Sequence, residues 1–240
     1  MEKQAKISSI ENFEIYHLIQ PVVNLINKQV LGFEFLLRSN VMEQPESLFK
    51  YAAEKGILLD LDLKSVEKVF QVIEQNSTLL KGLTVFVNVF PSTLLSDDFH
   101  LFIEKGMNKL AVNPKQIVLE INESETKTDT LALKETVQWL RKKEIRISLD
   151  DIGKGESTLK NIIEIEPDIS KIDSYFSQNL STHQKKQETV KHLVKLLKKD
   201  SLVILEGLET EKDLQTAKKL GITYAQGYHL GKPKNINHYL

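Results

Sequence analysis

Apolar and polar residues alternate along this chain in short strand-like runs, and longer helical runs separate them. Strands are predicted at residues 13–19, 30–38, 83–89, 116–121, 145–150, 168–173, 202–206 and 222–228. Most of these runs are rich in β-branched and aromatic residues. The repetition of a strand followed by a helix predicts a parallel sheet.

Helical patterns fill the intervals between the strands. Residues 46–76 have the periodicity of two helices with a break near Gly56, and Pro91 opens a helix whose apolar positions reach Leu110. Residues 190–197 show the i, i+3, i+4, i+7 spacing of an amphipathic helix. Further helices are predicted around residues 137–140, 159–163 and 214–220.

The number of strand–helix units indicates the fold. Seven or eight units in 240 residues suggest a closed (β/α)8, TIM-like barrel, which is an α/β fold. An open doubly wound sheet is the alternative, but it normally carries a glycine fingerprint after its first strand, and this sequence has none. Without a Pro/Gly/Ser-rich linker, residues 1–240 are expected to form one domain. About ten residues at the N-terminus are expected to form a flexible tail.

Composition narrows the choice of partner and compartment. The chain has 32 basic and 33 acidic residues, a net charge of −1, and no cysteine. No affinity for a nucleic acid polymer or an anionic membrane is therefore expected. The N-terminus lacks the apolar core of a signal peptide, and no run approaches the roughly 20 apolar residues of a membrane span. We expect a soluble, cytoplasmic protein that has no membrane partner.

A polar side chain stands at the end of almost every apolar run. In a parallel barrel these positions converge on one face, where the catalytic residues of such barrels lie. Neighbouring carboxylates repel one another, so a cation or proton uptake must compensate them. Oxygen ligands favour Mg²⁺ or Mn²⁺ over Zn²⁺, and the six histidines show no metal-ligand spacing. The converging residues are Glu34, Asn88, Glu120, Asp150, Asp151, Lys171, Glu206 and Gln226.

Two of these residues are adjacent aspartates, in the stretch IRISLDDIGKGESTL at residues 145–159. One carboxylate can bridge two cations while the other binds the second cation alone. Two ions roughly 3.5–4 Å apart clamp the attacking and leaving oxygens of a phosphoryl displacement. Any one of these acids taken alone is better explained as a helix cap or a residue of a solvated loop, but the complete set favours a two-metal site.

Seven motifs in a fixed order resemble the EAL family of cyclic di-GMP phosphodiesterases. The similarity extends from about Tyr16 to Pro233, and the naming motif appears as Glu34-Phe35-Leu36 within GFEFLLR. The other matching segments are VFVNVFPSTL, IVLEINES, SLDDIGKGESTL, ISKID, LEGLET and QGYHLGKP. The resemblance implies a barrel with one irregular antiparallel strand and two Mg²⁺ or Mn²⁺ ions. It also implies hydrolysis of cyclic di-GMP to linear pGpG, and a homodimer.

The resemblance also implies a role for each matching residue. Lys171 would orient or help activate the attacking water, Gln226 would support the water and metal network, and Glu123 would steady the loop after the paired aspartates. Arg38 would bind a substrate phosphate, and a guanidinium fork suits that contact. Metal ligands would be Glu34, Asn88, Glu120 and Asp150 for the first ion and Asp150, Asp151 and Glu206 for the second, with a base-like role also open to Glu206. Gln20 and Asp62 would lie on the substrate side, although Asp62 could equally begin a helix.

Several alternatives stay open at this point. The loop DIGKGEST departs from the usual DFGTGYSS of active members, so a receptor that binds cyclic di-GMP without cutting it is the second hypothesis. Ligands displaced by a fraction of an ångström can cost about 10²-fold in rate. A weaker third hypothesis is an interaction domain that has lost the ligand. Lys171 could also be a Schiff-base lysine, as in barrel aldolases, but that reading leaves the carboxylates unexplained.

Overall fold

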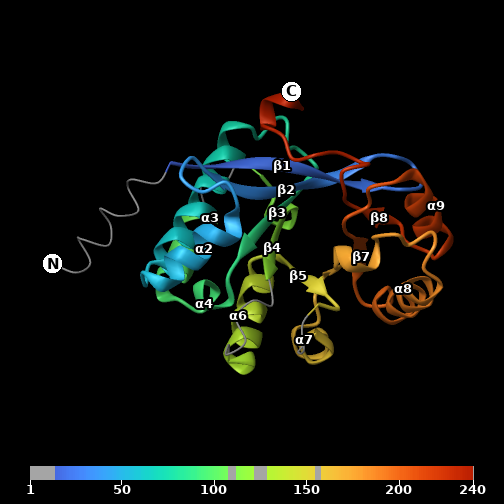
Figure 1. Cartoon of the computed structure of the whole chain (residues 1–240). Coiled ribbons are helices and arrows are strands. Elements are labelled where there is room, and N and C mark those ends of the chain that lie inside the picture. The colour runs from blue at the N-terminus through green and yellow to red at the C-terminus, as the bar shows by residue number, and fades with distance from the viewer. Residues whose placement is uncertain (1–13, 108–111, 122–128, 155–157, 240) are drawn as a thin grey trace.

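Eight strands close into a barrel in the order β1 to β8 in the computed structural model of the chain (Figure 1). The structure describes residues 14–107, 112–121, 129–154 and 158–239. The expected TIM-like α/β barrel is confirmed. The strands are β1 Ile15–Asn24, β2 Val30–Ser39, β3 Thr84–Val89, β4 Ile117–Ile121, β5 Arg146–Ile152, β6 Ile169–Ile172, β7 Leu202–Leu205 and β8 Tyr224–Ala225.

The antiparallel strand is β1, which runs opposite to both of its neighbours, β2 and β8. No helix lies between β1 and β2, because the chain turns back within a few residues. The side chain of Asn24 stabilises this turn by accepting the backbone N–H of Ile26 at 2.8 Å. A tight turn of this kind joins antiparallel strands, whereas parallel strands need a longer crossover.

The helices cover the outside of the barrel. Gly56, at a φ of 65°, separates α2 from α3, as the sequence predicts. In the described part of the chain the helices are α2 Pro45–Glu54, α3 Leu58–Gln75, α4 Pro91–Leu94, α5 Asp97–Met107, α6 Thr130–Lys142, α7 Thr158–Ile165, α8 Gln184–Leu197 and α9 Glu211–Lys219. Short 3-10 turns lie at Pro114–Gln116, Ser174–Phe176 and Ile236–His238.

Three expected boundaries were wrong. The last strand, expected over residues 222–228, covers only Tyr224–Ala225. The single helix from Pro91 to Leu110 is two helices, because the Ser96 hydroxyl accepts the N–H of Phe99 at 3.1 Å and starts a new helix; Leu110 itself lies outside the described residues. Strand β1 continues past Ile19 to Asn24. Pro21 is tolerated there because β8 pairs only with the last two residues of β1, so no ladder partner needs the missing N–H.

Alternate residues of each strand point into the barrel and fill it in layers. An apolar layer occupies the middle and consists of Val22, Phe86, Val118, Ile169 and Ile204. Two residues further along most strands, toward the C-terminal ends of β2 to β8, the inward positions become polar. This end of a parallel barrel carries the active site in enzymes of this architecture.

In the described segments, none of the helices combines the length and the apolar character that crossing a bilayer requires.

Candidate metal centre

The ammonium group of Lys171 lies at the centre of the barrel mouth and is completely buried. Four carboxylates from four other elements surround it. Its Nζ lies 2.8 Å from Glu206, 3.0 Å from Glu120, 3.2 Å from Glu34 and 3.4 Å from Asp150. The polar strand ends therefore meet in space, as the barrel geometry predicts.

Burial and mutual repulsion change the pKa values of these groups. Burial raises the pKa of Glu206 to about 8 with a contribution from Asp150, and burial raises the pKa of Glu120 well above its ordinary value. Burial also raises the pKa of Asp150. Burial alone would lower the pKa of Lys171, but the surrounding carboxylates raise it well above the ordinary range. The lysine is thus a permanent cation.

Amide side chains hold Glu34 in place. The Nδ2 group of Asn88 donates to Glu34 at 2.9 Å, and Nε2 of Gln226 donates to its other oxygen at 2.7 Å. Gln226 also donates to Oε1 of Gln20 at 3.0 Å, and Gln20 in turn donates to the carbonyl of Gly231 at 2.9 Å. Burial would raise the pKa of Glu34, but Lys171 and these donors hold it below its ordinary value.

The adjacent aspartates face the same site because the end of β5 is irregular. Strict alternation would place neighbouring side chains on opposite faces of the strand. The pairing of β5 with β6 shifts register after Leu149, and Asp151 adopts a left-handed φ of 54°. As a result, carboxylate oxygens of Asp150, Asp151 and Glu206 lie within 4.8 Å of one another. Strain of this kind is concentrated at functional sites.

The turn after the aspartates is fixed by close packing. Gly153 has a φ of 99°, and a Cβ there would lie 2.4 Å from the ring of Phe176. Lys154 follows and its Nζ lies 3.0 Å from Oδ2 of Asp151, which makes an ion pair at the edge of the site. The rest of the altered loop, residues 155–157, lies outside the described residues.

The donor set fits a pair of divalent cations. Oε2 of Glu120 and Oε1 of Gln226 are buried without a hydrogen-bond partner in the described structure, and Oε1 of Glu120 and Oδ1 of Asp150 have only their ion pair with Lys171. Buried polar groups are normally hydrogen-bonded, so such atoms indicate a missing ion or water. When ionised, the five carboxylates and Lys171 leave four negative charges, which is the charge that two divalent ions neutralise. Hard oxygen ligands suit Mg²⁺ and Mn²⁺.

A pocket of about 300 Å³ lies beside the centre, between β2, β3 and α3. Glu34, Asn88, Arg38 and Asp62 all line it. The guanidinium of Arg38 donates to the carbonyl of Leu37 at 2.7 Å, which orients the side chain at the pocket.

Asp62 is buried and accepts the N–H of Phe90 at 2.9 Å, so it also positions the start of α4. Of the expected site residues, only Glu123 lies outside the described residues.

His17 also lines this pocket, and no motif in the sequence predicts it there. Its Nε2 lies 3.0 Å from the hydroxyl of Ser65, its Nδ1 is buried without a partner in the described structure, and burial lowers its pKa to about 3. The only available signal was its position three residues before Gln20 on the same strand.

Fold and site together define a TIM-like barrel protein with an acidic, metal-type centre at its mouth. The EAL domain family matches residues 4–233, and the chain belongs to this family.

Among curated relatives, the chain is 25% identical to the Escherichia coli protein named cyclic di-GMP phosphodiesterase PdeF, over 95% of this chain and 31% of that protein. It is 29% identical to the E. coli protein named probable cyclic di-GMP phosphodiesterase PdeI, over 94% of this chain and 30% of that protein. The chain thus spans about a third of the length of these relatives.

Solved structures show the same fold. An EAL domain protein from Listeria monocytogenes EGD-e superposes with a TM-score of 0.84 at 20% identity, covering 99% of this chain and 95% of that one. The manganese and cyclic di-GMP complex of Klebsiella pneumoniae BlrP1 superposes with a TM-score of 0.79 at 23% identity, covering 91% and 59%. At these identities the comparison establishes the fold.

Proposed function

We propose that this chain hydrolyses one phosphodiester bond of cyclic di-GMP to give linear pGpG, with two divalent ions, Mg²⁺ or Mn²⁺. The observation that carries this proposal is the convergence of four carboxylates around the buried Lys171, with Asp151 beside two of them, and a total charge that two such ions would neutralise. Relatives named as cyclic di-GMP phosphodiesterases support the substrate.

Each ligand group has a place in this mechanism. Glu34, Asn88, Glu120 and Asp150 would hold one ion, and Asp150, Asp151 and Glu206 the other. When bound, two divalent ions would lower the pKa of a bound water and neutralise charge that develops on the phosphate. Asp150 would belong to both ligand sets, and its neighbour Asp151 would complete the second.

Lys171 acts as a donor and a positive charge. Its pKa is raised by the carboxylates, so it does not lose its proton to become a nucleophile or a base. A Schiff-base lysine needs the opposite shift. Lys171 therefore orients the attacking water, and Glu206, at 2.8 Å from it, is the group placed to accept the proton. Gln226 fixes Glu34 and so supports the ligand network.

The adjoining pocket would hold the nucleotide. Arg38 lines it together with Glu34, so its guanidinium can bind a substrate phosphate next to the ions. Asp62 shapes the same pocket through its bond to Phe90, and Gln20 supports Gln226 from the opposite strand. Glu123 keeps its proposed role in steadying the loop after β5.

A receptor that binds cyclic di-GMP without cutting it is the second candidate. The ion pair between Lys154 and Asp151 favours it, because the lysine neutralises a carboxylate that the second ion needs. A weak second ion would leave binding intact and slow the hydrolysis.

The proposal extends to a homodimer of single-domain chains. Leu131 on α6 and Leu159 and Ile163 on α7 are 66%, 61% and 70% exposed, and these two helices are neighbours. Three large apolar side chains exposed on adjacent helices support an interface with a second copy.

The test is an assay of cyclic di-GMP turnover with Mg²⁺ or Mn²⁺ in the reaction, in which chromatography identifies the products. We expect pGpG from the wild type and a loss of at least 10²-fold in Asp150→Asn and Glu206→Gln, because each removes a ligand charge. Saturable binding without product over a long incubation would establish the receptor. Absence of both turnover and binding, with either ion, would exclude both candidates.

A further inference from the structure

A second cavity, of about 570 Å³, lies on the outer wall of the barrel, away from the metal centre. The outer face of β1, helix α9 and the C-terminal segment 229–239 enclose it. Its floor is apolar: Val23 and Leu214 are buried, and Tyr239 packs against Phe33 with ring centroids 4.8 Å apart.

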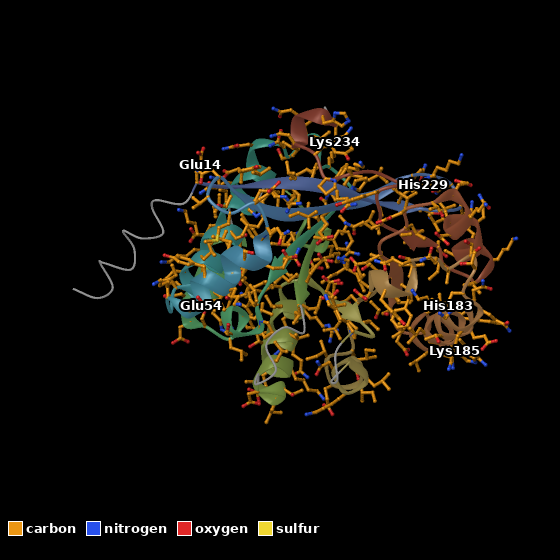
Figure 2. All side chains as sticks on the ribbon, viewed as in Figure 1. Glu14, Glu54, His183, Lys185, His229 and Lys234 are labelled. Atoms are coloured by element: carbon orange, nitrogen blue, oxygen red, sulfur yellow. The ribbon has the colours of Figure 1, made fainter. Side chains whose placement is uncertain are left out.

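The rim of this cavity is strongly basic. Lys28, Lys218, Lys232 and Lys234 line it, against one carboxylate, Glu211. Two residues that line the cavity are labelled in Figure 2: Lys234 lies near the C-terminal end of the chain, and His229 lies near α9. The chain as a whole has a net charge of −1, so this concentration of lysines is local.

Little of this positive charge is compensated. Hydrogen bonds with Gln215 and His229, and to a smaller extent the charge of Lys218, lower the pKa of Glu211. Nζ of Lys234 lies 2.7 Å from Nε2 of His238. No salt bridge among the described residues involves Lys28, Lys218 or Lys232. Glu211 is already engaged, because its carboxylate lies 2.9 Å from Nε2 of His229 and accepts from Gln215. Four ammonium groups around an apolar hollow produce a field that attracts and concentrates anions.

We propose that this cavity binds a small organic phosphate of nucleotide size. The apolar floor and Tyr239 would contact the organic body, and the lysines would contact the phosphates. The volume falls within the roughly 300–1,000 Å³ of pockets that bind small molecules. A ligand with a single carboxylate would neutralise only one of the four lysines, whereas a ligand with a di- or triphosphate group would neutralise most of them.

The cavity differs from the metal centre in its place and in its charge. The centre is acidic and lies at the barrel mouth, where divalent ions would mediate the contact with an anionic substrate, whereas the cavity is basic and lies on the outer wall, where lysines would contact phosphates directly. Phosphate binding here requires neither a divalent ion nor hydrolysis, and it can be tested in the presence of EDTA.

The experiment is a fluorescence titration of the full chain with TNP-ATP, in EDTA and at moderate salt. We expect saturable binding that weakens at least tenfold in the triple variant Lys28→Gln, Lys218→Gln, Lys232→Gln. A matched triple variant on α8, Lys185→Gln, Lys191→Gln, Lys195→Gln, removes the same charge from an exposed helix and should bind as the wild type does. Circular dichroism would establish that both variants are folded.

Competition identifies the ligand class. ATP should displace TNP-ATP at a lower concentration than inorganic phosphate does, because only ATP can also use the apolar floor. Equal loss of binding in both triple variants would mean that the protein attracts anions through its general charge, and it would overturn the proposal. Unchanged binding in the cavity variant, or absence of saturable binding in the wild type, would overturn it too.

Discussion

Lys171 shows how one residue can hold an acidic centre together. A buried lysine normally loses its proton, because burial disfavours the charged form. Here four carboxylates within 3.4 Å reverse that tendency and raise the pKa of the lysine well above its ordinary value. One ammonium cannot compensate all of them, so part of the carboxyl set holds protons at neutral pH until cations replace the protons.

The pH dependence of stability follows from Glu206. Its pKa is about 8 in the folded chain against an ordinary value of 4.5, so the folded state binds more protons between these values. Metal-free wild type should therefore lose stability as the pH rises toward 8. Relative to Glu206→Gln, we expect a loss of about 2 kcal/mol between pH 6 and pH 8. Urea denaturation in EDTA at both pH values measures it.

Mn²⁺ provides the control for this experiment. Because the ion compensates ionised carboxylates, it should restore more stability to the wild type at pH 8 than at pH 6. Glu206→Gln should show a smaller difference. Parallel pH profiles for the two proteins without metal would contradict the assignment of the raised pKa to Glu206.

At the residue level, the sequence was informative where geometry follows from periodicity. Polar residues such as Glu34 and Glu120 could be placed together because strand ends converge in any parallel barrel. The contact of Gln20 with Gly231 could not, because 211 positions separate the two residues and only the closed barrel joins them. The environment of His17 could not be predicted either, because its partner Ser65 lies on α3, 48 positions further along the chain.

Among the structural elements, the end of β5 and the turn that follows it position Asp151, the residue that would bind the proposed second ion. The register shift brings Asp151 to the site, and the next turn brings Lys154 to Asp151. The sequence showed two adjacent aspartates and an altered loop. It could not show that the lysine of that loop pairs with the second aspartate, because this depends on the left-handed φ of Asp151.

Replacement of Lys154 by Gln should release Asp151 for the ion. Exposed ion pairs of this type contribute about 0.2–1 kcal/mol, so Mn²⁺ should bind up to about fivefold more tightly. Lys160→Gln, on α7, is the matched control with the same charge change and no salt bridge in the described structure. Electron paramagnetic resonance of free Mn²⁺ measures the affinity. If Lys154→Gln binds Mn²⁺ as tightly as the wild type or less tightly, the salt bridge between Lys154 and Asp151 does not compete with the metal ion.

The elements themselves were largely predictable, with identifiable exceptions. Short apolar runs marked the strands, and Gly56 marked the break between α2 and α3. The predicted β1 was too short because proline is disfavoured inside a strand. Pro21 is tolerated because β8 does not pair with this part of β1. The break between α4 and α5 depends on a single hydroxyl, that of Ser96.

In the whole molecule, the junction between β1 and β8 connects the outer cavity to the metal centre. Strands β1 and β8 share only two residue pairs, and the C-terminal segment completes the junction through backbone bonds between Ile19 and Lys234 at 2.8 and 3.0 Å. From this segment a series of hydrogen bonds leads through Gly231, Gln20 and Gln226 to Glu34.

Gly231→Ala should disturb this connection. A Cβ at Gly231 would lie 2.5 Å from the ring of Pro21, so the segment must move and its bond to Gln20 must lengthen. Changes along such a network alter coupling by about 0.5–2 kcal/mol, and we expect Mn²⁺ to bind several-fold more weakly. Gly106→Ala, where a Cβ meets only ordinary contacts, is the control. Unchanged affinity in folded Gly231→Ala would show that the segment does not support the centre.

The reversed direction of β1 determines where the polypeptide enters the barrel. In a barrel of eight parallel strands the first strand starts at the end opposite the catalytic face. Here Ile15 pairs with Ser39 and Tyr16 with Arg38, so the chain enters at the end of the barrel that carries the acidic centre. A mechanical or chemical signal that arrives along the backbone ahead of Ile15 would reach Arg38 first, without having to cross the barrel.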